Sequence, residues 1–174
     1  MSTPTSLKEV YTDEIKDLWS ANDQMIRAVT TLTEGAHDSK LKKHLTSSVE
    51  GIAKHNEVLK ELLSSAGAEI EKEHCKGMEG LVREALTHAV KEAPENEDLK
   101  DIVIITQYQR MCHYGITGFG SVKAMAKALA MKDDVKKLEG IVADIYGADE
   151  LTSQMGEKLA KLAAKHEKTS AAAA

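Results

Sequence analysis

Four long segments of the chain repeat apolar residues at alternating steps of three and four positions. This spacing places the apolar side chains on one face of an α-helix and predicts four amphipathic helices that pack into a bundle. A polar residue interrupts each stripe near its middle, namely Asn22, Ser48, Gln109 and Asp149. Helix bundles build metal sites in this part of their interior, yet only one of the four residues is a carboxylate. We therefore expect an intact bundle with an altered interior.

The segments between these stripes predict how the helices connect. The first two helices are joined by a short turn from Gly35 to Asp38 and are therefore antiparallel neighbours, and Gly67 ends the second one. An irregular stretch with a short amphipathic helix follows, which predicts a long crossover to a second hairpin. The whole is an all-α, ferritin-like four-helix bundle of two antiparallel helix hairpins with a crossover and a short extra helix. The predicted elements are an N-terminal tail over 1–6, a bundle over 7–168 with helices over 7–34, 38–66, 78–91, 98–131 and 133–167, and a frayed alanine-rich tail over 169–174.

The placement of proline and glycine agrees with long helices. Pro4 and Pro94 are the only prolines, and both lie outside the predicted helices. Gly115, Gly118 and Gly120 fall within six residues of one helix. Because glycine lowers helix propensity, we expect a neighbouring helix to approach closely at these three positions.

Composition excludes several classes of partner. The chain has 174 residues, enough for one domain with a core that needs no disulfide or metal. Its 28 acidic and 23 basic residues give a net charge of −5, which argues against a nucleic-acid partner because phosphate binding needs a basic surface. No apolar run approaches the roughly 20 residues that span a bilayer, and no signal-peptide core is present, so we expect no membrane partner and a cytoplasmic location. Cys75 and Cys112 lack metal-type spacing and are expected to be reduced thiols.

Several stretches of the chain resemble the YciE/YciF family of bacterial ferritin-like proteins, from about residue 7 to 155. The resemblance lies in the run Leu7 to Trp19, the His44-Leu45 pair, the Cys75-Lys76-Gly77-Met78-Glu79-Gly80-Leu81 crossover, and Gln107 to Gly120 around His113-Tyr114. It implies a helical, dimer-forming, stress-associated protein. It also implies relatives whose carboxylates are suited to a di-iron or di-manganese centre.

The chain departs from the family pattern in all four long helices. Relatives typically show Asp-Ala-Glu, Glu-Glu-Thr, Glu-His-Tyr-Glu and paired glutamates where this chain has Ser20-Ala21-Asn22, Thr46-Ser47-Ser48, Cys112-His113-Tyr114-Gly115, and Asp144 with Ile145. Asp149 keeps the family's aspartate. Two divalent cations need several anionic ligands, which amides, hydroxyls, glycine and isoleucine do not supply. We therefore expect no dinuclear centre, no cofactor and no catalytic residue.

The polar residues of the interior have a structural interpretation. The expected polar layer contains Asn22, Ser47, Ser48, Gln109, Cys112, Gly115 and Asp149. A buried Asn22 can fix the register of its helix through a hydrogen bond, and Gln109 can complete a network with Ser48 and Asn22. We expect Asp149 to accept a hydrogen bond from Ser, Asn or Tyr, or to lie exposed at the edge of the stripe.

Two other interpretations remain open. The first is an iron- or manganese-dependent oxidase or peroxide-consuming enzyme with a rearranged centre, whose candidate ligands are Glu50, His55, Cys112, His113, Asp144 and Asp149. The second is a small molecule bound in the vacated interior, because Gly115 and Ser47 leave room. We expect the other histidines to be solvated; these are His37, His44, His74, His88 and His166.

We favour a non-catalytic, stress-associated or interaction protein that forms a homodimer. The homodimer follows from the family resemblance. The sequence adds apolar residues outside the stripes, which need to be covered. They are Trp19, Ile26, Val58, Leu63, Leu81 and Val103.

Overall fold

The computed structural model describes residues 3–172, with side chains as far as residue 166. Throughout this described range the regular structure is helical and includes no strand, so the predicted all-α class is confirmed. The elements are α1 (Leu7–Gly35), α2 (Ser39–Ser65), α3 (Lys76–Leu86), the π-helical segment η1 (Thr87–Lys91), α4 (Glu97–Ala128) and α5 (Lys132–Ala172).

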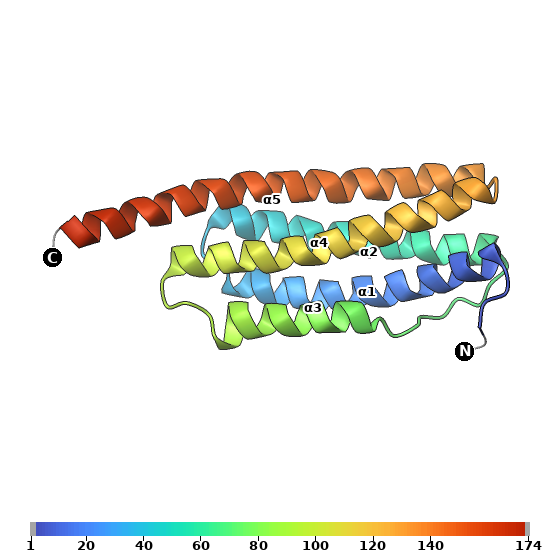
Figure 1. Cartoon of the computed structure of the whole chain (residues 1–174), viewed down its shortest axis with the longest axis horizontal. Helices are drawn as coiled ribbons and strands as arrows, with labels where there is room; N and C mark the ends of the chain where they lie inside the picture. The colour runs from blue at the N-terminus through green and yellow to red at the C-terminus, as the bar shows by residue number, and fades with distance from the viewer. Residues whose placement is uncertain (1–2, 173–174) are drawn as a thin grey trace.

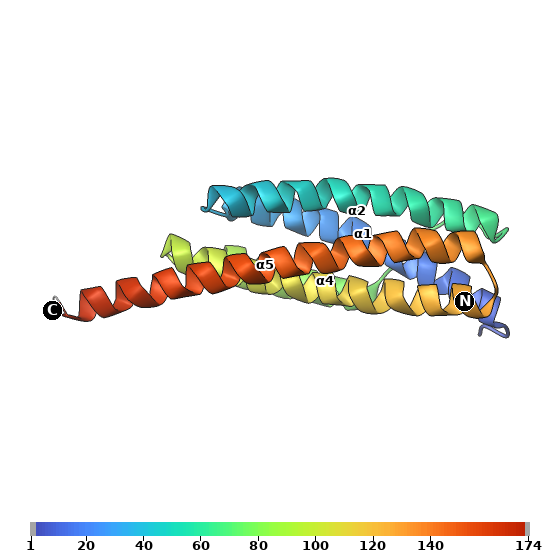
Figure 2. The same cartoon turned by 90° about the horizontal axis from the view of Figure 1, so that it is seen from above.

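The four long helices form a bundle of two antiparallel hairpins. Helices α1 and α2 make the first hairpin and α4 and α5 the second, and the two lie against each other along their length (Figures 1 and 2). Helix α3 runs along the outside of the bundle, packed on α1 and α4. The C-terminal part of α5 extends beyond the other helices (Figure 1). This is the predicted ferritin-like layout, with one long crossover between the hairpins.

Local side chains set most of the helix starts. Ser6 accepts a hydrogen bond from Glu9 N at 3.2 Å, and Asn96 accepts one from Leu99 N at 3.0 Å. Asp38 begins α2 as expected, since its carboxylate accepts from both Lys40 N and Leu41 N at 2.9 Å. These side-chain oxygens satisfy N–H groups that have no partner within the helix.

Several helix boundaries differ from the predicted ones. α3 starts at Lys76, two residues before the predicted start, because Cys75 accepts a hydrogen bond from Met78 N through its sulfur. α4 ends at Ala128 and not at residue 131, since the chain turns at Ala130, whose φ is +58°. α5 runs to Ala172, so residues 169–172 of the predicted frayed tail are helical. Residues 1–2 and 173–174 of the two predicted tails lie outside the described residues.

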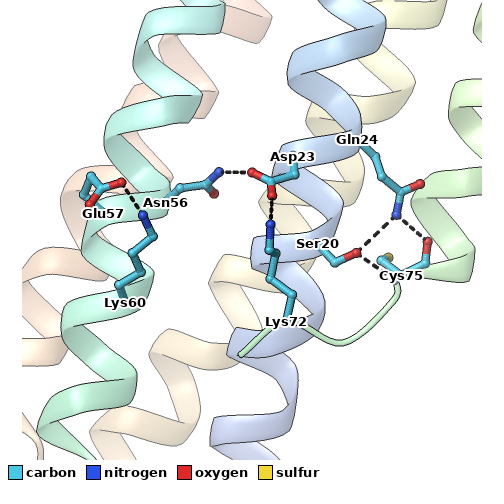
Figure 3. A network of polar contacts seen from close by, with 8 residues as sticks. All are labelled: Ser20, Asp23, Gln24, Asn56, Glu57, Lys60, Lys72 and Cys75. Carbon is cyan, nitrogen blue, oxygen red and sulfur yellow. Dashed lines mark hydrogen bonds and ion pairs between the residues drawn. The ribbon is translucent and has the colours of Figure 1, made fainter. Parts of the chain in front are cut away.

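The crossover is fastened to α1 by two sets of polar contacts (Figure 3). Gln24 on α1 donates a hydrogen bond to the carbonyl oxygen of Cys75 at 2.9 Å. Lys72 forms an ion pair with Asp23, the residue before Gln24 on α1, and the other oxygen of that carboxylate accepts from Asn56 Nδ2 of α2 at 2.8 Å. These contacts bring the start of α3 against α1 and tie the crossover to both helices of the first hairpin.

The buried face of α4 is turned relative to the predicted stripe. Tyr108 and Met111 are buried at 1% and 0% exposure, whereas the predicted stripe residue Gln109 is only half-buried. An α-helix drifts by about 20° per heptad against a seven-residue repeat, so a long stripe does not stay on one side. α4 is also covered by α1, α3 and α5 together, which lets residues on more than one face be buried.

Two of the three glycines of α4 lie where another helix approaches. A Cβ atom at Gly118 would lie 2.5 Å from Cδ2 of Leu18 on α1, and one at Gly115 would lie 3.4 Å from Cδ1 of Ile145 on α5. A Cβ atom at Gly120 would meet no atom within 4 Å. The expected close approach is therefore found at Gly118 and Gly115 and is wrong for Gly120.

The two neighbouring glycines give a stability prediction with an internal control. Gly120→Ala should gain up to about 1 kcal/mol from helix propensity alone. Gly118→Ala has the same gain but must displace the buried Leu18, and overpacking typically costs about 1–3 kcal/mol. Gly118→Ala should therefore be about 1–3 kcal/mol less stable than Gly120→Ala in urea unfolding. Equal stability of the two variants would contradict the packing at Gly118.

Candidate functional site

A cavity of about 230 Å³ lies at mid-length between the four helices of the bundle. Buried residues form its inner wall, including Asn22, Met25, Ile52, Met111 and Cys112. Exposed or half-buried residues of α2 and α5 form its mouth; these are Ser47, Gly51 and Asp144. The remaining lining residues are His44, Ser48, His55, Tyr108, Gly115, Ile145 and Ala148. All four long helices contribute to this one hollow.

The departures from the family pattern converge on this cavity. The residues found where the resemblance implies glutamate are smaller or uncharged, and most of them line the hollow. They are Asn22, Ser47, Cys112, Gly115 and Ile145. Asp144 is the single carboxylate of the lining, and its side chain is 74% exposed. The cavity is therefore nearly free of negative charge where a metal centre would need it.

Ser20, another departure from the pattern, has a different role. It is buried on the α3 side of α1, where its hydroxyl oxygen accepts a hydrogen bond from Cys75 N at 3.1 Å and from Gln24 Nε2 at 3.3 Å. It does not line the cavity. Ser20 thus helps to hold the crossover on α1 (Figure 3).

The predicted network of Asn22, Gln109 and Ser48 is wrong. Asn22 is 6% exposed, and among the described residues its Nδ2 atom has no hydrogen-bond partner. Ser48 instead accepts from the hydroxyl of Tyr108 at 2.8 Å and donates to the carbonyl oxygen of His44 at 3.0 Å. The turned face of α4 explains the difference, because it brings Tyr108 to the interior in place of Gln109.

Gln109 and Asp149 form a separate cluster outside the cavity. Gln109 Nε2 donates to Asp149 Oδ1 at 3.1 Å and to Ser153 Oγ at 2.8 Å. His113 Nε2 lies 3.1 Å from Asp149 Oδ2, and the imidazole side chain is 65% exposed. Asp149 therefore accepts from Gln109 and contacts His113. The expected Ser, Asn or Tyr donor is not among these partners.

The candidate metal ligands are spread over different places. His55 Nε2 lies 3.3 Å from Asp144 Oδ2 at the cavity mouth, whereas His113 pairs with Asp149 outside the cavity. Glu50 is exposed on α2. Within the described part of the chain, no three His, Cys, Asp or Glu side chains are grouped so that they can hold a metal ion.

Cys112 is buried in the cavity wall as a protonated thiol. Burial raises the pKa of Cys112 to about 12, and Asp149 adds to the rise. The thiolate is the form that ligates metals and attacks electrophiles, so a thiol with this pKa is inert near neutral pH. Cys75 is also buried, and both cysteines are free, as the sequence predicts.

His44, which we expected to be solvated, is buried. Its Nε2 atom lies 2.8 Å from Oγ1 of Thr152 on α5. The Thr152 hydroxyl donates to the carbonyl oxygen of Ala148 at 2.6 Å, so its oxygen accepts from His44. The imidazole also packs edge-on against Tyr108, with ring centroids 5.7 Å apart. The signal for this burial was present in the sequence, because His44 precedes Ser48 by four positions and shares its helix face.

Burial of two histidines predicts a pH dependence of stability. Burial lowers the pKa of His44 and of His55 from the ordinary value of 6.5, and Asp144 only partly offsets this for His55. The unfolded chain therefore binds protons more readily, so stability is complete above pH 6.5 and falls below it. We expect the free energy of unfolding to fall by up to about 1.4 kcal/mol for each histidine with each pH unit below 6.5.

The measurement compares urea unfolding at about pH 7.5 and about pH 5.5 for the wild type and His44→Gln. Glutamine keeps a donor for Thr152 but does not titrate in this range. The variant should lose less stability than the wild type between the two pH values. The same loss in both proteins would show that His44 is protonated as easily in the folded chain as in the unfolded one.

In the stretch from residue 3 to 172, no helix combines the length and the apolar character that crossing a bilayer requires.

Residues 6–166 match the protein family described as a domain of unknown function, DUF892. The chain belongs to this family. Protein YciF of Escherichia coli strain K12 is 26% identical to this DUF892 chain over 148 residues, which cover 83% of the chain and 86% of YciF. The resemblance to the YciE/YciF family drawn from the sequence is thereby confirmed.

Solved structures share the fold of this DUF892 protein. The crystal structure of the E. coli stress protein YciF matches with a TM-score of 0.85 at 23% identity, covering 91% of this chain and 99% of YciF. YcfI from Rhodopseudomonas palustris matches with a TM-score of 0.81 at 24% identity, covering 86% and 94% of the two chains. A protein of Xanthomonas campestris pv. campestris matches with a TM-score of 0.75 at 13% identity, covering 94% and 99%.

Proposed function

We propose that this DUF892 protein is a non-catalytic, stress-associated or interaction protein whose bundle holds no dinuclear metal centre. The observation that carries the proposal is the lining of the cavity. Asn22, Ser47, Cys112 and Gly115 meet there, at positions where the resemblance implies glutamate. None of these four residues supplies a negative charge near neutral pH, since burial keeps the Cys112 thiol protonated.

Electrostatics makes this loss decisive for a pair of divalent ions. Two dications about 4 Å apart repel each other by roughly 16 kcal/mol at an effective dielectric constant of about 20. Bundles offset this repulsion with four or more carboxylates, several of which bridge the two ions. Asp144 is mostly exposed and already paired with His55. The donor set therefore does not fit a di-iron or di-manganese centre.

The stress association rests on the relatives. The solved E. coli YciF is described as a stress protein, and this chain shares its fold over nearly the full length of both proteins. A protein that acts without a metal centre can still protect or bind a partner through its surface. We propose a cytoplasmic location and a bacterial stress setting on the same basis.

The homodimer is proposed from the family resemblance, since the chain itself covers most of the apolar residues that suggested one. Leu63 is fully buried in the core, and Trp19 lies beneath the ammonium groups of Lys60 and Lys72, at 5.2 and 5.1 Å from its ring. Among the residues whose side chains are described, the exposed large apolar ones are Leu7, Ile70, Val90, Leu99, Tyr146, Leu151 and Leu162. Sedimentation equilibrium tests the proposal, and a monomer at all concentrations would refute the dimer.

A metal titration followed by thermal unfolding tests the loss of the centre. Ligand binding to the folded state raises the unfolding temperature, so an intact site should respond strongly to Fe²⁺ or Mn²⁺. We expect a change below about 1 °C with either ion, or with a chelator, and no consumption of hydrogen peroxide beyond that of free iron. A saturable rise that ends at two ions per chain would overturn the proposal.

A further inference from the structure

Asn22 belongs to the wall of the cavity, and its buried amide nitrogen has no hydrogen-bond partner among the described residues. The Asn22 residue is only 6% exposed and lines the cavity from α1. Within the described residues its Nδ2 atom has no hydrogen-bond acceptor. A buried N–H group is costly to leave unpaired, and it is normally satisfied by protein, water or a bound molecule. Because Asn22 lines the cavity, a molecule bound there can supply such an acceptor.

The size of the cavity limits what the acceptor can be. A dry apolar cavity of about 150 Å³ holds a benzene molecule. The cavity here measures about 230 Å³, which leaves room for an aromatic ring with a short substituent. Met25 and Met111 belong to its inner wall, and their flexible side chains adapt to the shape of a ligand.

The charge of the lining limits the ligand further. Among the described residues no lysine or arginine lines the cavity, and burial lowers the pKa of its two histidines, His44 and His55, which disfavours the charged form that a carboxylate or phosphate would pair with. Asp144 at the mouth also repels anions. Its carboxylate already contacts His55, which makes it less available to bind a cation. Met25, Ile52, Met111 and the other apolar side chains favour an uncharged molecule.

We propose that the cavity binds one small, uncharged, largely apolar molecule with a carbonyl oxygen that accepts a hydrogen bond from Asn22 Nδ2. The molecule enters between α2 and α5, through the mouth formed by Ser47, Gly51 and Asp144. This inference rests on the proposed absence of a dinuclear centre, because bound metal ions would occupy the same hollow.

Three probes of the same size and shape separate the contributions. Acetophenone carries the carbonyl acceptor, cumene replaces it with a methyl-bearing carbon, and benzoate replaces the methyl group with a charged oxygen. Followed by NMR titration of the full chain, acetophenone should bind saturably and about five- to tenfold more tightly than cumene, the ratio that one net hydrogen bond provides. Benzoate should not bind, because the cavity offers no cation to offset the cost of burying its charge.

Two variants locate the hydrogen bond. Asn22→Leu keeps the branched shape of the side chain but removes the donor, so the carbonyl oxygen of bound acetophenone is left unpaired and acetophenone should no longer bind more tightly than cumene. Asn22→Ala, a second variant without a donor, gives the same comparison with a larger cavity. Asn56→Leu is the matched control, since Asn56 is equally buried but does not line the cavity. It should keep the wild-type ratio.

Each result bears on the inference in one direction. The inference is overturned by any one of four results: no saturable binding of acetophenone, equal binding of cumene, binding of benzoate, or an unchanged ratio in Asn22→Leu and Asn22→Ala. The metal content of the same sample separates the two proposals. Stoichiometric metal refutes the proposed function, whereas a metal-free protein that does not bind acetophenone refutes only the proposed ligand binding.

Discussion

A variant with Asn22→Glu, Ser47→Glu, Cys112→Glu and Gly115→Glu is expected to fold stably only with a divalent metal ion present. All four positions line one cavity, and Asn22 and Cys112 are only 6% and 3% exposed. Each buried, unpaired carboxylate costs several kcal/mol or is forced to take up a proton. This total is comparable to the whole stability of an ordinary domain, about 5–15 kcal/mol.

Metal ions should offset part of this loss because they supply the missing positive charge. At a free Mn²⁺ concentration of about 100 times the dissociation constant, binding adds about 2.7 kcal/mol, or roughly 5–10 °C in unfolding temperature for a chain of this length. The control carries glutamine at the same four positions, which has the size of glutamate without its charge. A glutamate variant that responds to Mn²⁺ no more than the glutamine variant would show that the four positions do not form an ion site.

Asp101→Asn is expected to destabilise the protein by about 2–4 kcal/mol. Asp101 lies on α4 and is 1% exposed, and its two carboxylate oxygens accept from His37 N at 2.7 Å and Asp38 N at 2.6 Å. These contacts tie the turn between α1 and α2 to the second hairpin. An asparagine side chain can accept only one of the two bonds and would direct its own N–H groups at the other donor.

Asp98→Asn is the matched control for this prediction. Asp98 lies one turn earlier on the same helix, is partly exposed and contacts His166, so its replacement should cost less than about 1 kcal/mol. Urea unfolding of both variants gives the comparison. Similar losses in the two variants would mean that the contacts of Asp101 with the turn contribute little beyond an ordinary surface carboxylate.

The fold was predictable because its signals are local. The stop at Gly67 and the cap at Asp38 follow from the backbone freedom of glycine and from the reach of a short carboxylate, and neither depends on the rest of the chain. The hairpins then follow from the short turns. The end of α4 was missed because Ala130 adopts a positive φ, which an alanine in the sequence does not predict.

The candidate site was only partly predictable because it depends on how the helices are turned. Asn22, Ser47, Cys112 and Gly115 were placed in the interior from the sequence, and all four line the cavity, although Ser47 is exposed at its mouth. Gln109 was misplaced, since the covering of α4 by α3 cannot be read from the stripe of α4 alone.

Asp101 shows a second limit. Its partners, His37 and Asp38, lie more than sixty residues away in the sequence. An aspartate near the start of a helix predicts only an interaction with that helix's own N-terminus. A single sequence gives no sign that the carboxylate instead binds the backbone of a distant turn.

The metal content of the purified protein tests the central claim most directly. Cells that produce the chain are grown with added iron and manganese, and the protein is dialysed against a chelator before elemental analysis. A cavity with one exposed carboxylate should retain fewer than about 0.1 ions per chain. Two iron or manganese ions per chain after dialysis would contradict the account.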